Sequence, residues 1–294
     1  MLRHAFLICA VSTGLYAEDL VNAVGPADKA PVDVEADGPW SFDATLGAFF
    51  RNVATKNADT SRDSPINGSA ETISYLVKFD GKLTWASDPH SVEQTLIARF
   101  GREKPEDGPW VENTDEIDYE GAYKYHFTPP HFTYGAWGLE TVFTGVEPDR
   151  EPFDPATAKL SAGYGQKHIW EDEAKRSWEW RIGARAQRTW GRRQGDENRD
   201  IETGAEFWTR YEAEPMEKVR WWVQYEAFSE FEDLGHISNL LTGAFTYQLM
   251  EYLSLQLTVR GYYESAPDEA SSDAIGYDEL SLRQESLIGL TYQF

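Results

Sequence analysis

The chain has 294 residues, of which 50 are acidic and 27 are basic, and its formal charge is −23. This negative charge argues against binding of nucleic acid and against a general attraction to anionic lipid. Hydrophobic residues make up 41% of the chain, yet no run beyond the N-terminus reaches the length of about 18 apolar residues that a membrane-spanning helix needs. A membrane β-barrel stays possible, because its lipid-facing and polar lumen residues alternate and give a low mean hydropathy, here −0.56.

Residues 1–17 have the order of a secretory signal peptide: a basic start, an apolar stretch over residues 5–11, and small residues that end at Ala17. We expect cleavage after Ala17 and a flexible periplasmic leader over residues 18–39, which show no periodicity. The single cysteine, Cys9, lies within the signal. The exported chain is therefore predicted to have no disulfide, no thiol ligand and no lipid anchor.

From Trp40 onward apolar and polar residues alternate with a period of two, which is the period of a β-strand. In residues 71–86, for example, Val77 falls on the apolar face, while Lys78 and Asp80 fall on the polar one. A strand that crosses an outer membrane needs about 9 to 11 residues. The pattern predicts about 12 strands, at residues 40–51, 71–86, 91–103, 116–127, 132–144, 156–168, 177–190, 200–212, 218–231, 237–249, 253–265 and 280–294.

The predicted connections alternate in length, as they do in outer-membrane barrels, where periplasmic turns are short and outer loops are longer. Short connections fall at residues 87–90, 128–131, 169–176, 213–217 and 250–252, and longer ones at residues 52–70, 104–115, 145–155 and 266–279. An even number of strands returns both ends of the barrel to the periplasm. We therefore expect an all-β protein: a monomeric, transmembrane, antiparallel up-and-down β-barrel over residues 40–294 in a bacterial outer membrane.

The last strand ends with apolar residues at alternating positions: Ile288, Leu290, Tyr292 and Phe294. A terminal Phe preceded by this alternation resembles the C-terminal signature that the barrel-assembly machinery reads. We expect these four residues to act as an assembly signal and the machinery to be a partner of the chain.

Short motifs in the middle of the chain are similar to those of a known family. They are the strand end Leu83-Thr84-Trp85, the segment Leu-Ser-Ala-Gly-Tyr-Gly at residues 160–165, and the final Leu-Ile-Gly-Leu-Thr-Tyr-Gln-Phe. On these motifs the stretch from about residue 72 to residue 170 resembles the salt-induced outer-membrane protein family, barrels of uncharacterised function. The resemblance implies an outer-membrane barrel and a link to salt or osmotic response, and it supplies no catalytic residues.

The sequence gives no sign of an enzyme site or a cofactor. It has no HExxH motif, no phosphate-binding glycine loop and no cysteine cluster. A lipid-modifying barrel enzyme, the first alternative function, would need a serine and a histidine within hydrogen-bond reach on the lipid side, and no histidine has a serine two residues away on its own predicted strand. A loop-mediated adhesin or receptor, the second alternative, would need long structured outer loops.

By parity the lumen face carries interleaved charges of both signs, and these are the candidate site residues. They are Lys78, Asp80, Lys82, Arg99, Glu120, Lys124, Glu179, Arg181, Arg185, Glu206, Arg210, Arg220, Glu226, Arg260, Arg283 and Glu285. One interpretation is a salt-bridged filling that stiffens a narrow barrel, since unpaired charges in a water-poor cavity are costly. The other is a thin aqueous path for small polar solutes or cations.

The predicted outer loops are rich in carboxylates, among them Asp59, Asp63, Asp115, Asp278 and Glu279. Oxygen-rich loops can gather divalent cations, because calcium takes six to eight oxygen ligands. No loop has the regular spacing of a calcium-binding loop, so we expect diffuse screening by cations rather than an ordered site.

Overall fold

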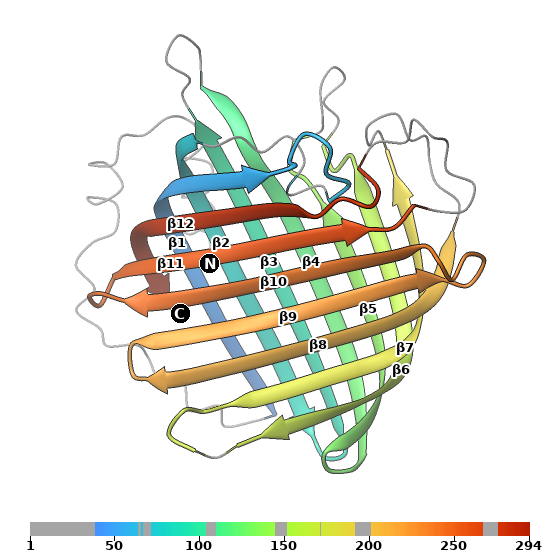
Figure 1. Ribbon diagram of the computed structural model, residues 1–294. Coiled ribbons are helices and arrows are strands. Elements are labelled where there is room, and N and C mark those ends of the chain that lie inside the picture. The colour runs from blue at the N-terminus through green and yellow to red at the C-terminus, as the bar shows by residue number, and fades with distance from the viewer. Residues whose placement is uncertain are drawn as a thin grey trace. The chain divides into compact units, whose positions relative to one another are not determined.

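A computed structural model of the chain describes residues 39–63, 66, 72–103, 110–144, 152–170, 172–191, 201–266 and 276–294, which form twelve β-strands (Figure 1). The strands are β1 (Trp40–Lys56), β2 (Thr72–Ser87), β3 (His90–Glu103), β4 (Val111–Thr128), β5 (His131–Thr141), β6 (Ala156–Ile169), β7 (Ser177–Trp190), β8 (Glu202–Met216), β9 (Val219–Glu230), β10 (Ile237–Gln248), β11 (Leu253–Glu264) and β12 (Ser281–Gln293). The predicted signal peptide and all but the last residue of the predicted leader lie outside the described residues. Within the described ranges, no helix is long and apolar enough to cross a membrane.

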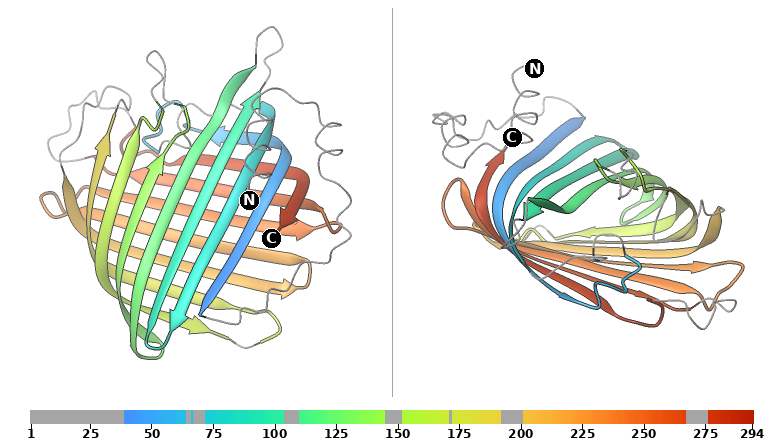
Figure 2. Two further views of the ribbon diagram at one scale, coloured as in Figure 1. Left: turned by 180° about the vertical axis from the view of Figure 1, so that it is seen from behind. Right: turned by 90° about the horizontal axis from the view of Figure 1, so that it is seen from above.

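The strands close into one antiparallel sheet. Each strand pairs with the next one in the chain, and β12 pairs with β1 in a register that sets Thr45 opposite Gln293. The twelve-stranded antiparallel up-and-down barrel predicted from the alternation is thereby confirmed. Strands β8–β11 form one wall and β2–β5 the facing wall (Figures 1 and 2).

Several strand ends differ from the predicted ones. β1 continues to Lys56 instead of ending at residue 51, β4 begins at Val111 instead of residue 116, and β8 reaches Met216 instead of residue 212. Backbone pairing continues through these segments, although apolar and polar residues do not alternate regularly along them. Apolar and polar residues alternate only where a strand separates lipid from the lumen. The alternation therefore underestimates the length of strands that extend beyond the lipid.

The two faces of the sheet have opposite character, which β12 shows clearly. Arg283, Glu285 and Leu287 are buried, whereas the alternating Ile288 and Leu290 are exposed on the outside. Charges inside and large apolar side chains outside are the reverse of a soluble barrel and fit a barrel surrounded by lipid.

Glycines on β7 and β8 allow aromatic rings to lie against the inner wall. A Cβ atom on Gly183 would lie 2.6 Å from the Tyr134 hydroxyl, and one on Gly204 would lie 2.7 Å from the Phe228 ring. These rings from β5 and β9 therefore pack over the backbone of their neighbours and fill part of the lumen.

The lumen is also apolar in places, which the parity argument did not predict. Phe49, Leu76 and Leu287, from β1, β2 and β12, form a buried cluster on the inner face. This cluster takes up space between the charged side chains and narrows the polar part of the lumen.

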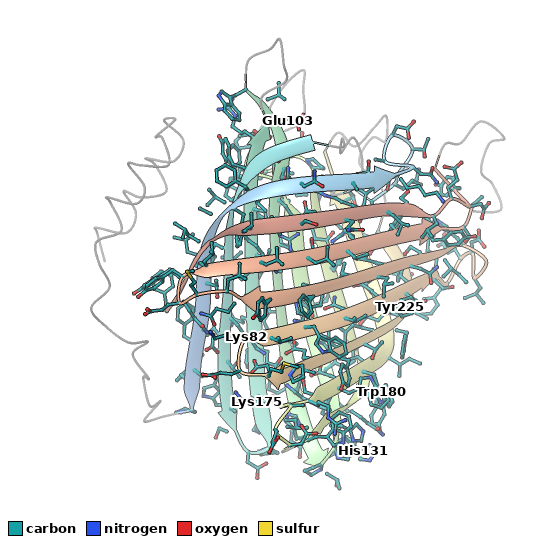
Figure 3. The ribbon with its side chains drawn as sticks, turned by 60° about the vertical axis from the view of Figure 1, so that its left-hand side comes forward. Lys82, Glu103, His131, Lys175, Trp180 and Tyr225 are labelled. Carbon is teal, nitrogen blue, oxygen red and sulfur yellow. The ribbon has the colours of Figure 1, made fainter. Side chains whose placement is uncertain are left out.

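Aromatic side chains form a belt on the outside of the end that carries the short turns. His131 stacks on Phe127 and Tyr164 with ring centroids 6.0 and 5.9 Å apart, and Tyr164 meets Trp180 at 5.6 Å. Figure 3 shows His131 and Trp180 at this end of the barrel. Amphipathic rings prefer the level of the lipid headgroups, so this belt marks one membrane interface.

Candidate functional site in the barrel lumen

A cluster of charges near the short-turn end, here called the lower cluster, is centred on Lys124. Lys124 is 1% exposed and lies 2.8 Å from Glu179 and 3.2 Å from Glu93. Lys167 lies 3.0 Å from Glu93 and 3.6 Å from Glu179. Two ammonium groups and two carboxylates from β3, β4, β6 and β7 thus neutralise one another inside the barrel.

Arg181 extends the lower cluster toward the middle of the barrel. Its Nε donates to Glu179 at 2.8 Å, and its Nη1 donates to Glu120 of β4 at 3.1 Å. The guanidinium also lies 3.9 Å from the ring centroid of Trp208, a favourable cation–π position. Arg181 is therefore held by charge on two sides and by a ring on a third.

A second group, the central cluster, surrounds Arg185. Arg185 pairs with Glu226 and lies 3.7 Å from Glu206, which accepts a hydrogen bond of 2.7 Å from the Tyr134 hydroxyl. The Arg185 guanidinium lies 4.1 Å from the centre of the Phe228 ring. Charged and aromatic groups from β5, β7, β8 and β9 thus pack together.

Near the long-loop end, Glu285 is held by Arg283 at 2.6 Å and by Arg51 at 3.2 Å. Arg51 of β1 and Arg283 of β12 both donate to the Thr114 hydroxyl of β4, Arg283 at 3.2 Å. Strands β1 and β12 are therefore tied to β4 across the lumen.

The other predicted lumen residues lie in smaller pairs or at the mouth. Lys78 pairs with Asp80 at 2.8 Å, and Arg99 pairs with Glu116 at 3.2 Å. Towards the short-turn mouth, Arg210 pairs with Glu212, and Lys82 is exposed. The Arg220 side chain is 58% exposed, and its contacts to Glu212 and Glu214 are 3.8 and 3.6 Å long.

The loop after β1 also reaches the lumen. Asp63 was expected among the exposed outer-loop carboxylates, but it is buried and accepts two hydrogen bonds from Arg260 of β11, at 2.6 and 2.9 Å. That expectation was wrong because the loop folds inward, where a lumen guanidinium neutralises the carboxylate.

The four residues of the predicted assembly signal lie at the short-turn end of the barrel. Ile288, Leu290, Tyr292 and Phe294 are all exposed apolar side chains. They remain predicted assembly residues: three lie on the strand that closes the barrel, and Phe294 follows it directly.

A serine–histidine pair forms that the sequence argument did not anticipate. Ser91 Oγ lies 2.9 Å from His126 Nε2, between the neighbouring strands β3 and β4. Both residues have lumen parity, because they are in register with Lys124 and Phe132, which are buried inside. The two residues lie on different strands, so the register of β3 with β4 creates this pair.

Several described carboxylates of the predicted outer loops have protein partners. The Asp115 carboxylate accepts hydrogen bonds from the backbone N–H groups of Phe143 and Thr144, at 2.6 and 2.7 Å. In the parts of the chain that the structure describes, no group of at least three His, Cys, Asp or Glu residues is arranged to hold a metal ion. Many of the predicted loop carboxylates, including Glu106, Glu147 and Asp268, lie outside the described residues.

Some members of the clusters were missed from the sequence. Arg51, Lys159 and Lys167 take part in lumen ion pairs, yet they lie at the ends of predicted strands or on less regular ones. Continuing the period of two from Lys159 would have placed Lys167 on the same face. The aromatic partners Trp208 and Phe228 carry no polarity signal, so nothing in the alternation marked them as lumen residues.

A closed barrel with ion pairs inside and apolar side chains outside defines the class: this is a transmembrane β-barrel. The chain belongs to the DUF481 family, described as proteins of unknown function, whose model matches residues 67–275. That description does not include the salt-induced name that the sequence motifs suggested. No curated protein matches the chain.

Among solved structures, similar barrels include outer-membrane proteins. The COG4313 outer-membrane channel from Pseudomonas putida F1 is 12% identical, with a TM-score of 0.38 over 90% of this chain and 100% of that one. The NanC porin is 8% identical, with a TM-score of 0.40 over 85% and 99%. The translocator domain of the autotransporter NalP from Neisseria meningitidis is 10% identical, with a TM-score of 0.38 over 89% and 90%. The fold assignment rests on the chain's own strand pairing.

Proposed function

We propose that this protein is a narrow outer-membrane channel for small polar solutes and cations. The observation that carries the proposal is that charged side chains of strands three apart in the barrel meet inside it. Lys124 of β4 meets Glu179 of β7, and Lys167 of β6 meets Glu93 of β3. Side chains that reach each other across three strands leave only narrow passages in the lumen. Because these side chains are polar, the passages favour water and small polar solutes.

The strand number supports a narrow channel. A barrel of about eight strands is just filled by side chains, whereas one of 16 to 18 strands leaves an aqueous channel. The twelve strands here lie between these limits. The ion pairs and the inward rings of Tyr134 and Phe228 occupy much of the additional space.

Cation preference is proposed from the charge of the outer mouth. The described loop residues there include Asp59, Glu232, Asp233 and Asp278, while the charges of the lumen clusters largely neutralise one another. Selectivity that arises at an exposed mouth is screened by salt, because the Debye length is about 8 Å at physiological ionic strength.

Conductance in a planar bilayer tests the proposal. We expect small conductance steps that prefer potassium over chloride, with a preference that weakens from about 0.05 M to about 1 M salt as the Debye length shortens. A large, anion-selective conductance in the unmodified protein would contradict the proposal and favour a porin for acidic solutes.

The alternative of a lipid-modifying enzyme requires a serine–histidine pair that faces lipid. Ser91 and His126 have lumen parity, so they favour a structural hydrogen bond over lipid chemistry. If the purified protein hydrolysed phospholipid and the Ser91→Ala variant did not, the enzyme alternative would be favoured instead.

A role in salt or osmotic response is part of the proposal and rests on the family resemblance of the motifs at residues 83–85, 160–165 and 287–294. Growth of a deletion strain at high and low salt tests it. A growth defect confined to one salt range and restored by the intact gene is the expected result.

A further inference from the structure

The loop after β1 is folded against the inside of the barrel over its described residues, 57–63 and 66. Ser61 and Ile66 are 0% exposed and Asp63 is 6% exposed, which is unusual for an outer loop of mixed polarity. The backbone N–H of Ile66 donates to the Asp63 carbonyl at 3.1 Å. In Figure 1 the blue segment after β1 lies beside the orange and red strands.

Several contacts fix this loop to β11, β12 and the connection between them. Arg62 Nε lies 3.0 Å from the Glu264 carboxylate, and the Arg62 guanidinium lies 4.1 Å from the centre of the Tyr277 ring. Thr60 donates to Glu279 at 2.9 Å. A Cβ atom on Gly276, whose φ is +88°, would lie 2.0 Å from the Thr60 carbonyl oxygen, so only glycine allows this approach.

The partner of Asp63 lies well inside the barrel. Arg260 is four positions before Glu264, the last residue of β11, or about 13 Å along the strand at roughly 3.3 Å per residue. Its Nε and Nη2 donate to the two carboxylate oxygens of Asp63 at 2.6 and 2.9 Å. Arg260 also interacts electrostatically with Glu116 and Glu140 of the facing strands β4 and β5. The pair therefore stands between two walls of the lumen.

We propose that Asp63 and Arg260 form the constriction of the outer half of the channel and that their pairing keeps this constriction electrically neutral. This inference rests on the proposed channel function and adds the residues that permeating ions pass in the outer half. A paired carboxylate and guanidinium cancel each other's long-range field, so the intact pair favours neither sign of ion strongly. Loss of one charge leaves the other facing the passage.

Two single variants with opposite consequences test the proposal. Asp63→Asn keeps the shape of the side chain and leaves Arg260 uncompensated, so the permeability ratio of potassium to chloride should fall. Arg260→Gln leaves Asp63 uncompensated, so the same ratio should rise. The permeability of each ion should change roughly fivefold, the effect of one unit charge about 4 Å away in a watery pore, and it should change in opposite directions for potassium and chloride. The double variant should return the ratio close to that of the unmodified protein. Reversal potentials in a salt gradient across a planar bilayer measure all three.

A structural role alone predicts a different result. If the pair only holds the loop, both single variants should raise conductance and leave the permeability ratio unchanged. If both single variants conduct and their reversal potentials shift in the same direction, or do not shift, the proposal is overturned. Heat-modifiable migration on gels confirms that each variant has folded before it is measured.

Crosslinking tests the placement of the loop without relying on conduction. The only native cysteine is Cys9, so introduced cysteines report without interference from the barrel. Asp63→Cys combined with Arg260→Cys should be joined by a short bifunctional thiol reagent. The matched control, Asp59→Cys with Arg260→Cys, should not, because Asp59 is exposed on the same loop.

The two measurements separate the possible failures. A crosslink in a barrel that never conducts would refute the channel function and leave the pair as a closure of the lumen. Conduction without opposite shifts would refute only the constriction. Absence of the crosslink would refute the inward placement of the loop, and with it the constriction.

Discussion

Lys124 neutralises two carboxylates inside the barrel, so we expect this single residue to affect the stability of the barrel strongly. Its ammonium group lies between Glu93 and Glu179, and its side chain is almost completely shielded from solvent. Removing one partner from a buried ion pair leaves an uncompensated charge, which costs far more than an exposed pair contributes.

Lys124→Met should lower the free energy of unfolding by about 3–5 kcal/mol, because Glu93 and Glu179 then face each other without their shared ammonium group, and Lys167 and Arg181 compensate them in part. Lys82→Met is the matched control, since Lys82 has lumen parity but is exposed at the mouth. It should change the free energy of unfolding by no more than about 0.5 kcal/mol. Urea unfolding of the barrel in lipid vesicles measures both, and equal effects would contradict the assignment.

His236 joins two carboxylates at the outer rim. Its Nδ1 lies 2.8 Å from Glu230 and its Nε2 lies 2.9 Å from Glu264. Only the protonated imidazolium can donate through both nitrogens. The hydrogen bond with Glu264, together with the charges of both carboxylates, raises the pKa of His236 above its usual 6.5, against the opposing effect of burial.

A raised pKa means that His236 stabilises the rim fully below about pH 6.5, the pKa in the unfolded state, and loses this contribution as the pH rises through its higher folded pKa. Hydrogen exchange in residues 231–237 should therefore be faster at pH 9 than at pH 6, beyond the intrinsic effect of pH, which an unstructured peptide of the same sequence supplies. His236→Gln should remove this excess. The same excess in His236→Gln would show that another group is responsible.

The strand β12 is the element that closes the barrel, because it pairs with both β1 and β11. Its inner face contributes Arg283, Glu285 and Leu287 to the lumen, and its outer face contributes the apolar series that ends at Phe294. One strand thus completes the barrel and carries the predicted assembly signal.

Deletion of Phe294 should lower the yield of inserted barrel and leave export intact, because the predicted signal peptide and the C-terminal strand act at different steps. Gln293→Ala is the control, since it alters a polar residue beside the terminal Phe. The fraction of heat-modifiable protein in outer-membrane preparations measures the result. An unchanged fraction after deletion of Phe294 would count against an assembly role.

At the scale of the whole molecule, the lumen is a network in which no cluster belongs to one strand pair. Arg181 connects β7 to β4, Arg185 connects β7 to β9, and Arg51 connects β1 to β4. Stability and permeability are therefore coupled, because the side chains that obstruct the passage also hold the walls together.

Replacing Arg181, Arg185 and Arg210 together with glutamine should leave Glu179, Glu226 and Glu212 undercompensated. The barrel should lose roughly 5 kcal/mol or more of unfolding free energy, with less than additive contributions from residues that share partners. Molecules that fold should conduct cations better than the unmodified protein. Arg220→Gln, an exposed change at the mouth, is the control. Unchanged stability and unchanged conductance in the triple variant would argue against a coupled lumen network.

Much of this architecture follows from the sequence by itself. The number of strands, the direction of Val77 and Lys78 and the alternation of short and long connections depend on local geometry, since successive residues of a strand point to opposite faces whatever their partners are. The strand ends beyond the alternating part could not be read in this way, because backbone pairing continues there without a regular alternation of apolar and polar residues.

Only the tertiary structure decided which charges meet. Lys124 and Glu179 were both predicted to face the lumen, but their contact depends on the stagger and curvature with which the sheet closes, and these bring together strands that are not neighbours. The pair of Ser91 and His126 depends on the register of two strands. The burial of Asp63 against Arg260 depends on the inward path of a loop with no periodicity, so no local pattern in the sequence could specify it.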